Sequence, residues 1–138
     1  MTSIRRLSSR VAYENAWLRL REDAIERPDG ERGVYALVER EDFAVVIPWD
    51  GEQVTLVGQE RYTLGRFSWE LPQGGVSGAS PEEVARTELA EETGLRAREL
   101  RHLGRLDTAV GMSSQASTCG WPRASSRASP TPSPRRSR

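Results

Sequence analysis

Three glutamates near the middle of the chain, Glu88, Glu91 and Glu92, have the type and spacing that could do chemistry. In a helix, residues three and four positions apart share a face, so these carboxylates would project together. Like charges so close repel one another unless a cation lies among them, and Mg²⁺ prefers carboxylate oxygen and bridges to phosphate. A glycine-rich loop at residues 74–78 precedes them, and glycine lets the backbone approach a metal or phosphate closely. Together these features indicate a divalent-cation site, although a glutamate cluster alone is also typical of a solvated helix face.

The residues around this cluster predict the helix that must carry it. Ser80 is a favourable N-cap, Pro81 suits the first helical position, and Glu83 lies where it completes a capping box. Gly94 is a natural residue for the position after the last turn. We therefore predict a helix over about residues 81–93.

Strands are indicated on either side of this helix. Alternating apolar and polar residues are typical of half-buried strands, and the continuous apolar run Phe43–Ile47 suits a strand buried on both faces. Asp50-Gly51 is a hairpin signal, and Pro28-Asp29-Gly30 a turn. The strands expected are Val11–Tyr13, Trp17–Glu26, Gly33–Glu39, Phe43–Ile47 and Val54–Val57, with another through Leu100, Leu103 and Leu106. We predict a small antiparallel sheet over about residues 8–40 and a mixed central sheet.

Length, charge and cysteine content narrow the class of protein. The 138 residues suit one domain, and 20 basic and 20 acidic residues cancel, so bulk charge does not favour nucleic acid or an anionic membrane. The single cysteine, Cys119, excludes an intramolecular disulfide and a cysteine-based zinc site. No apolar run approaches the about 20 residues that span a bilayer, and the start lacks the apolar core of a secretory signal. A cytoplasmic protein without a membrane partner is the default expectation.

The segment 116–138 differs from the rest of the chain. It holds five arginines, four prolines and no acidic residue. Such a composition cannot bury enough apolar surface to offset its ordering entropy, so we expect a disordered Arg/Ser/Pro-rich tail after a folded domain at residues 1–115. One hypothesis for the change is a shifted reading frame, because GC-rich codons for this tail can be reread as an apolar strand followed by an acidic loop. Sequencing the gene tests it.

The segment at residues 71–95, LPQGGVSGASPEEVARTELAEETGL, resembles the Nudix box, GX5EX7REUXEEXGU, and the chain from about residue 10 to 115 looks like an ADP-ribose pyrophosphatase of that family. Within the box at 74–95, the matching residues are Gly74, Glu88, Leu89, Glu91, Glu92, Gly94 and Leu95. The chain departs from the pattern in three ways. The step from Gly74 to Glu88 is 14 residues rather than 15, Ala79 stands at the family's first glutamate, and Thr87 stands at its arginine. The metal-ligand positions are intact.

This resemblance implies an α+β fold, a Nudix α/β/α sandwich with an N-terminal antiparallel sheet, whose C-terminal part is missing or replaced here. It implies a hydrolase that splits a nucleoside diphosphate linked to another moiety, ADP-ribose or a nucleotide sugar, with Mg²⁺ or Mn²⁺ as cofactor. The alternative is a truncated, catalytically impaired Nudix-fold protein. The N-terminal strands also look like the sheet through which ADP-ribose pyrophosphatases form homodimers. Nucleic-acid binding through the basic tail has only charge in its favour.

The family's metal site carries over onto four residues of this sequence. Glu88 and Glu92 would be the principal metal ligands, and the main-chain carbonyl of Gln73 a further one. Glu91 would be another ligand or the base that positions water. The resemblance therefore assigns the catalytic roles to Glu91 and Glu92.

Two residues upstream of the box are candidates for substrate binding. Arg61 could contact a substrate phosphate, because a guanidinium binds phosphate bidentately; a solvated strand arginine is the alternative. Glu70 could be either a substrate-side or a structural carboxylate. We expect Trp69 to lie in the core rather than to stack on a base.

Overall fold

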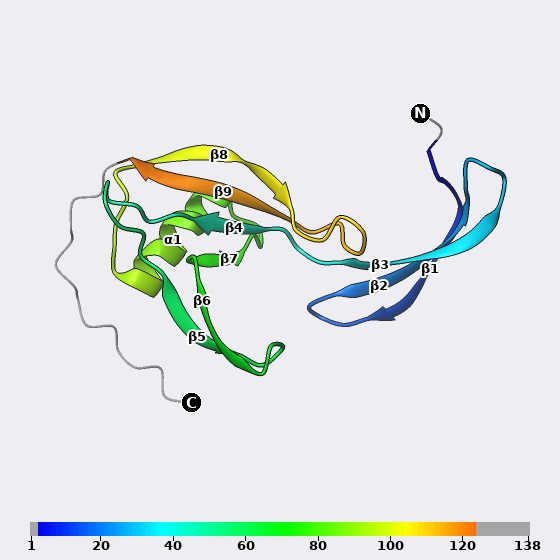
Figure 1. Cartoon of the computed structure of the whole chain (residues 1–138), viewed down its shortest axis with the longest axis horizontal. Helices are drawn as coiled ribbons and strands as arrows, with labels where there is room; N and C mark the ends of the chain where they lie inside the picture. Colours follow the sequence, from blue (N-terminus) through cyan, green and yellow to red (C-terminus); the bar gives the residue numbers. More distant parts are fainter. Residues whose placement is uncertain (1–2, 124–138) are drawn as a thin grey trace. The chain divides into compact units, whose positions relative to one another are not determined.

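The computed structural model describes residues 3–123, without the side chains of 121–123. The chain divides into two compact units: unit 1 comprises Met1–Glu41 and Asp107–Ala116, and unit 2 comprises Asp42–Leu106 and Ser117–Arg138. In chain order the elements are β1 (Arg5–Glu14), β2 (Arg19–Glu26), β3 (Arg32–Glu39), β4 (Phe43–Val46), β5 (Val57–Arg61), β6 (Arg66–Glu70), β7 (Gln73–Gly75), α1 (Pro81–Thr93), β8 (Glu99–Asp107) and β9 (Ala116–Arg123) (Figure 1).

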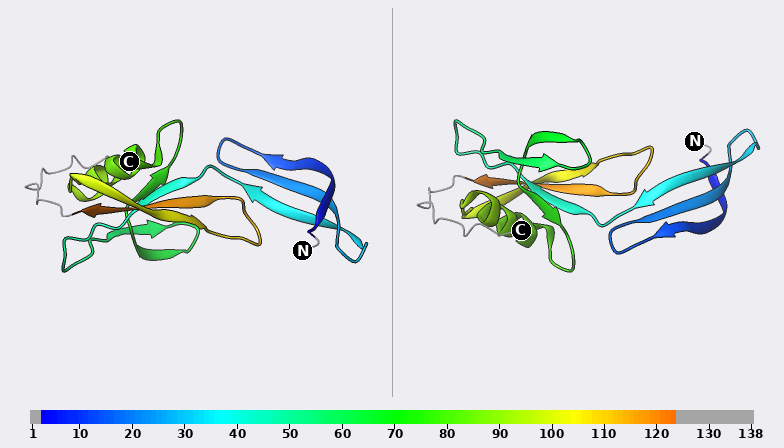
Figure 2. Two further views of the ribbon diagram at one scale, coloured as in Figure 1. Left: turned by 90° about the horizontal axis from the view of Figure 1, so that it is seen from above. Right: turned by 90° about the horizontal axis from the view of Figure 1, so that it is seen from below.

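Unit 1 is built on a three-stranded antiparallel sheet in the order β1-β2-β3. The turn between β2 and β3 has Gly30 at φ 89°, a left-handed conformation that favours glycine. Every residue of β1 is exposed, and arginine–glutamate pairs such as Arg5 with Glu26 (2.8 Å) join it to β2. The antiparallel N-terminal sheet expected from the sequence is therefore present, and its twisted strands can be followed in Figure 2.

A segment from much later in the chain completes unit 1. The hydroxyl of Tyr35 donates a hydrogen bond to the carbonyl of Gly111 at 2.9 Å. The main-chain N–H of Val38 donates to the carbonyl of Met112 at 2.8 Å, and the hydroxyl of Ser113 donates to the carbonyl of Val38 at 2.8 Å. Strand β3 is thus held by residues more than seventy positions downstream.

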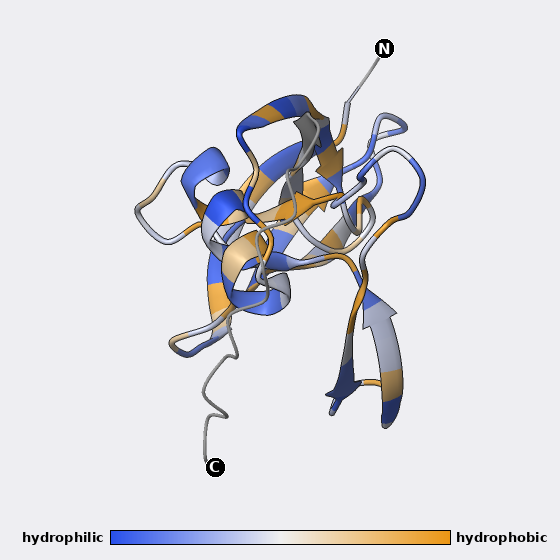
Figure 3. Cartoon of the chain, turned by 90° about the vertical axis from the view of Figure 1, so that its left-hand side faces the viewer, coloured by the Kyte–Doolittle hydropathy of each residue, from blue (hydrophilic) through white to orange (hydrophobic). Residues whose placement is uncertain are grey.

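Unit 2 contains a four-stranded mixed sheet in the order β7-β4-β9-β8, with α1 packed on it. Strand β4 pairs antiparallel with β7 and parallel with β9. Ala44 and Val46 of β4 are fully buried against Ala85 and Leu89 of α1 and form the core. The colouring of Figure 3 shows hydrophobic segments interrupting the hydrophilic ones along the strands and the helix. The expected apolar strand at residues 43–47 is confirmed over Phe43–Val46.

Strands β5 and β6 form a separate two-stranded hairpin within unit 2. Its outer face carries Phe67 and Trp69, whose rings meet edge to face with centroids 5.1 Å apart. Both rings lie over Gly58, where a Cβ atom would come within 2.4 Å of Phe67 and 2.9 Å of Trp69. Trp69 is 67% exposed, so the expectation that it lies in the core was wrong. The pair covers a glycine backbone instead.

Helix α1 has the bounds and caps expected from the sequence. The Ser80 hydroxyl accepts a hydrogen bond from the Glu83 N–H, and the Glu83 carboxylate accepts one from the Ser80 N–H at 2.8 Å. Gly94 ends the helix at φ 74°, and its N–H donates to the Ala90 carbonyl. It is the only α-helix among residues 3–123, and no helix there is long and apolar enough to cross a membrane.

Removal of this cap gives a stability prediction. Ser80→Ala should lower the free energy of unfolding by about 1 kcal/mol at neutral pH, because the Glu83 N–H loses its acceptor. The backbone and hydroxyl hydrogen bonds from Ser80 lower the pKa of Glu83. A lowered folded-state pKa stabilises the protein above the unfolded pKa, and this is lost as pH falls through the folded value. Denaturant titrations of both proteins should therefore differ less in acid than at neutral pH; an equal gap at both would contradict the role of Glu83.

The tail expected to be disordered from residue 116 onward begins instead with a strand. β9 spans Ala116–Arg123, and its first residues pair in parallel with β4, Phe43 opposite Ser117. Ala116 is fully buried and Cys119 is 7% exposed. Pairing with β4 gives this segment backbone partners and burial that its composition does not indicate. Residues 124–138, the rest of the expected tail, lie outside the described residues.

Candidate active site

The second half of α1 presents the three glutamates singled out in the sequence. Glu88 and Glu92 are four residues apart and Glu91 lies between them, so they occupy neighbouring positions on one side of the helix. Glu88 is half-buried, whereas Glu91 and Glu92 are exposed. Leu89, the residue after Glu88 and about 100° from it around the helix axis, is 1% exposed in the core and fixes the rotation of the helix about that axis.

Strand β7 passes directly against these glutamates at Gly74. A Cβ atom at Gly74 would lie 2.2 Å from Oε1 and 2.5 Å from Cδ of Glu88. Strand β4 holds this backbone in register, with Ala44 opposite Gly74. The absence of a side chain at Gly74 is what lets the carboxylate of Glu88 lie against the strand, which gives a physical reason for a glycine at this position.

A second contact joins β7 to the helix through Gln73. Its main-chain N–H donates to Oε2 of Glu92 at 3.3 Å. Its side-chain amide donates to Oε2 of Glu70 at 3.1 Å. Gln73 therefore bonds at once to a carboxylate of the helix and to one of the β5–β6 hairpin.

Glu70 and Arg61 face each other across the hairpin. Nε of Arg61 donates to both carboxylate oxygens of Glu70 at 2.9 and 3.0 Å, and Nη2 donates to Oε2. The amide of Gln59 also donates to Glu70, at 3.4 Å. Two of the three guanidinium nitrogens of Arg61 are thus occupied by an internal partner. The structural reading of Glu70 fits this arrangement, and Nη1 of Arg61 is the nitrogen that these bonds leave for an anion.

The charges of the site differ sharply between the hairpin and the helix. The Arg61 hydrogen bonds, opposed by burial and aided by Ser68, lower the pKa of Glu70 to about 2. The hydrogen bonds to Glu70 raise the pKa of Arg61, and the charges of Glu70 and Glu92 add to this. Burial raises the pKa of Glu88, and the charges of Glu92 and Glu91 raise it further. In the hairpin, Arg61 and Glu70 form an ion pair with no net charge. On the helix, Glu88, Glu91 and Glu92 place three carboxylates side by side without an ion-pair partner among the described residues.

The donor chemistry of this edge fits a hard divalent cation. No ion pair among the described residues involves Glu88, Glu91 or Glu92, and the charges of Glu91 and Glu92 raise the pKa of Glu88, as expected of carboxylates that repel one another. Carboxylate and main-chain oxygens are the ligands that Mg²⁺ prefers. In the conformation that the structure describes for residues 3–123, no three His, Cys, Asp or Glu side chains converge closely enough to hold a metal. The glutamates and the main chain of β7 therefore supply the types of ligand that the cation needs, but in this conformation the side chains do not surround a single point.

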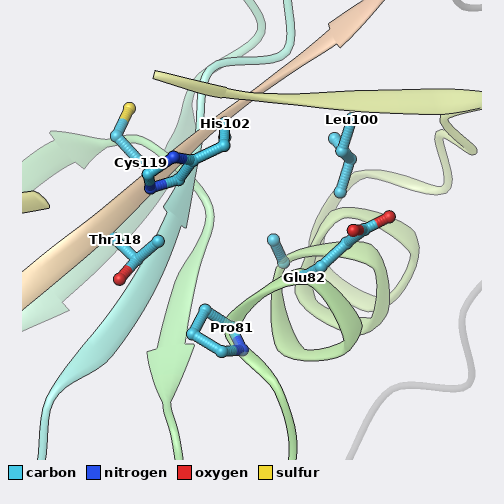
Figure 4. Close-up of a pocket in the computed structure, with 8 residues that line it drawn as sticks. Pro81, Glu82, Leu100, His102, Thr118 and Cys119 are labelled. Atoms are coloured by element: carbon cyan, nitrogen blue, oxygen red, sulfur yellow. The ribbon is translucent and has the colours of Figure 1, made fainter. Parts of the chain in front are cut away.

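The chain's only histidine and only cysteine line a separate pocket beside the first turns of α1. His102 and Cys119 come from β8 and β9, and Pro81, Glu82 and Ala85 from the beginning of the helix (Figure 4). In this view the sulfur of Cys119 points away from Pro81 and Glu82. Burial raises the pKa of the Cys119 thiol, which keeps it protonated. Nothing in this pocket resembles a metal cluster or an activated nucleophile.

The fold and the glutamate helix define a class of protein, and comparison with known families agrees. Residues 39–119 match the NUDIX domain, so the chain belongs to the Nudix family, as the sequence of the box indicated. Residues 4–38 match the nucleoside diphosphate sugar hydrolase N-terminal domain. The α+β fold expected for this family is confirmed: residues 3–123 form one mixed sheet, two antiparallel sheets including the N-terminal one, and one helix.

Individual relatives sharpen this assignment. An ADP-ribose pyrophosphatase of Mycobacterium tuberculosis is 35% identical over 113 residues, which is 80% of this chain and 55% of the relative. A CMP-5'-(N-acetyl-N-hydroxy-3-aminopropyl)phosphonate hydrolase of Streptomyces rubellomurinus is 30% identical, over 75% of this chain and 51% of the relative. The crystal structure of an ADP compounds hydrolase superposes with a TM-score of 0.80 at 19% identity, covering 91% of this chain and 70% of that one. The chain thus spans about half the length of these two relatives and shares the fold of the third.

Proposed function

We propose that this chain is a Mg²⁺-dependent Nudix pyrophosphohydrolase that cleaves a nucleoside diphosphate linked to another moiety, ADP-ribose or a nucleotide sugar. The observation that carries the proposal is the contact of the α1 glutamates with β7: Glu88 lies against Gly74 and Glu92 accepts from Gln73. Within a chain that matches the Nudix domain, this contact supports an oxygen-rich metal site at one edge of unit 2. Mn²⁺ would bind the same ligand types.

Each residue has a role under this proposal. Glu88, Glu92 and the Gln73 carbonyl would hold the cation, which when bound neutralises the diphosphate and lowers the pKa of water. Glu91 would be a further ligand or would accept the proton of the attacking water as its oxygen bonds to phosphorus and the P–O bond of the diphosphate breaks. Arg61 would contact the substrate phosphate through Nη1, with Glu70 fixing its orientation.

The substrate class follows from the two halves of the match. The N-terminal strands match a domain of nucleoside diphosphate sugar hydrolases, and one relative is an ADP-ribose pyrophosphatase. Both descriptions name a diphosphate that joins a nucleoside to a sugar, and the phosphonate hydrolase also acts on a nucleotide-linked compound. We therefore put ADP-ribose first and nucleotide sugars second.

The test is hydrolysis of a panel of ADP-ribose and nucleotide sugars with Mg²⁺, Mn²⁺ or excess EDTA, with product nucleotide measured by chromatography. ADP-ribose and water should yield AMP and ribose 5-phosphate in Mg²⁺ or Mn²⁺, and EDTA should stop the reaction. If a cooperatively folded protein that binds the metal turns over none of the panel, the proposal is overturned in favour of a catalytically impaired family member.

We also infer that the N-terminal sheet pairs with a second copy of the chain. All of β1 is exposed, and Val11, Tyr13 and Val34 of this sheet are 50%, 55% and 67% exposed. Apolar side chains along an exposed strand favour pairing with another chain. Sedimentation should give a dimer for the unaltered protein and a monomer for Val11→Glu; a monomer in both would overturn the inference.

A further inference from the structure

Gln73 connects two parts of unit 2, the β5–β6 hairpin and helix α1. Its Nε2 donates to Oε2 of Glu70 at 3.1 Å, while the main-chain N–H of the same residue donates to Oε2 of Glu92 at 3.3 Å. Gln73 is also the first residue of β7, opposite Val45 of β4. One residue therefore joins the β5–β6 hairpin, the mixed sheet and the glutamate helix.

Glu70 is a firm anchor for that side chain. Its side chain is 15% exposed, and Arg61 and Gln59 both donate to it in addition to Gln73. Hydrogen bonds to a charged, half-buried carboxylate are stronger than neutral ones. Because the Arg61 bonds fix the carboxylate, the amide of Gln73 is held at a set position rather than left to sample rotamers.

We propose that Gln73 is a positioning residue, whose side chain, tied to Glu70, sets the orientation of its own main-chain groups toward Glu92. This inference rests on the proposed metal-dependent function, in which the Gln73 carbonyl is a ligand. Partners of this kind orient the ligands of a metal site, and their loss typically weakens metal binding by about 10- to 100-fold. The side chain of Gln73 would thus affect cation binding only by orienting the main-chain carbonyl of the same residue.

Because the proposed ligand of Gln73 is its main-chain carbonyl, a change of the side chain separates the role of orienting the ligand from the role of the ligand itself. Gln73→Met keeps the length of the side chain and every main-chain atom, and it removes only the amide that donates to Glu70. A weaker site in this variant reports lost orientation, because no candidate ligand has been deleted. Gln53→Met is the matched control: Gln53 is an exposed glutamine in the loop before β5.

The experiment measures Mn²⁺ binding to the full chain without substrate, by electron paramagnetic resonance, together with thermal unfolding. We expect Gln73→Met to raise the Mn²⁺ dissociation constant about tenfold, with Gln53→Met and the unfolding midpoint of either metal-free variant unchanged. In turnover, the Mg²⁺ concentration for half-maximal rate should rise while the KM for ADP-ribose at saturating Mg²⁺ stays the same. An unaltered dissociation constant in Gln73→Met overturns the inference and leaves the proposed function standing.

A double-mutant cycle tests whether the Gln73 side chain affects metal binding through its hydrogen bond to Glu70. If Gln73 acts through Glu70, then Glu70→Ala and the combination Glu70→Ala with Gln73→Met should bind Mn²⁺ equally, because the second change removes nothing further. Additive losses would overturn this route. Failure of the unaltered protein to bind Mn²⁺ would overturn the proposed function and this inference together, which distinguishes it from failure in Gln73→Met alone.

Discussion

Glu92→Gln is expected to reduce Mg²⁺-dependent hydrolysis of ADP-ribose by more than about 100-fold. Loss of partners that merely orient a metal ligand typically costs about 10- to 100-fold, and Glu92 is proposed as a ligand itself. The amide also cannot offer the negative charge that a hard cation prefers. The measurement is the initial rate of AMP release across a Mg²⁺ titration, so that weaker metal binding is separated from a lower maximal rate.

The same helix supplies a matched control for this substitution. Glu82 is an exposed glutamate in the first turn of α1, ten residues before Glu92, and it pairs with Arg86 at 2.8 Å. Glu82→Gln should keep the rate within about twofold, because an exposed pair of this kind contributes little. Equal losses in Glu82→Gln and Glu92→Gln would mean that general helix charge, rather than a site at Glu92, supports activity.

Gly74→Ala should lower turnover by about 100-fold while the protein remains folded. The added Cβ would come within 2.2 Å of Oε1 and 2.7 Å of Cγ of Glu88, so that side chain must move. A carboxylate at the end of a flexible side chain can move at small cost to folding, whereas a displacement of about 1 Å at a reacting site can cost about 100-fold in rate. Steady-state rates and thermal unfolding, measured together, check both halves of the expectation.

The neighbouring glycine is the control for Gly74. A Cβ at Gly75 would meet nothing within 4 Å, so Gly75→Ala should preserve both turnover and stability. If Gly74→Ala instead unfolds the protein, the close approach of Glu88 is a packing constraint of the fold. If Gly74→Ala is as active as the unaltered chain, the position of Glu88 against β7 has no part in catalysis.

The helix and the N-terminal sheet could be predicted because their signals are local. Ser80, Glu83 and Gly94 satisfy the ends of α1 with their own side chains and backbone, so neighbours in sequence suffice to define it. Strands β2 and β3 follow each other through a turn whose Gly30 has the expected left-handed φ. Local chemistry and tertiary structure agree in these elements.

The errors lie where partners distant in sequence decide the outcome. The segment after residue 116 reads as disordered from its composition, but parallel pairing with β4, more than seventy residues earlier, makes its beginning a strand. Trp69 was expected in the core, and its exposure is set by the face of the hairpin on which it lies. The β5–β6 pairing itself was not predicted, although Gly65, with φ 60° between the two strands, was a turn signal.

The candidate site shows the same division. The glutamates of α1 could be singled out from their spacing, because helix geometry converts spacing directly into a shared face, whereas Gly74 was singled out by the glycine-rich loop and the resemblance to the Nudix box. The bond of Arg61 to Glu70 was not predicted, since it depends on the register that brings two strands together. The role of the Gln73 side chain was likewise hidden, because its partner belongs to another element.

The segment Asp107–Ala116, which completes unit 1, also has a consequence for the order in which this protein folds during its synthesis. Strands β1 to β3 have all their mutual partners once residue 39 has left the ribosome, yet Tyr35 and Val38 must wait for residues 111–113. Closing so long a loop carries an entropic cost that grows slowly with its length, and contacts of high sequence separation form slowly. The nascent N-terminal sheet therefore lacks these hydrogen bonds to Tyr35 and Val38 until residues 111–113 have been synthesised, and an incompletely bonded sheet of this kind is prone to aggregate.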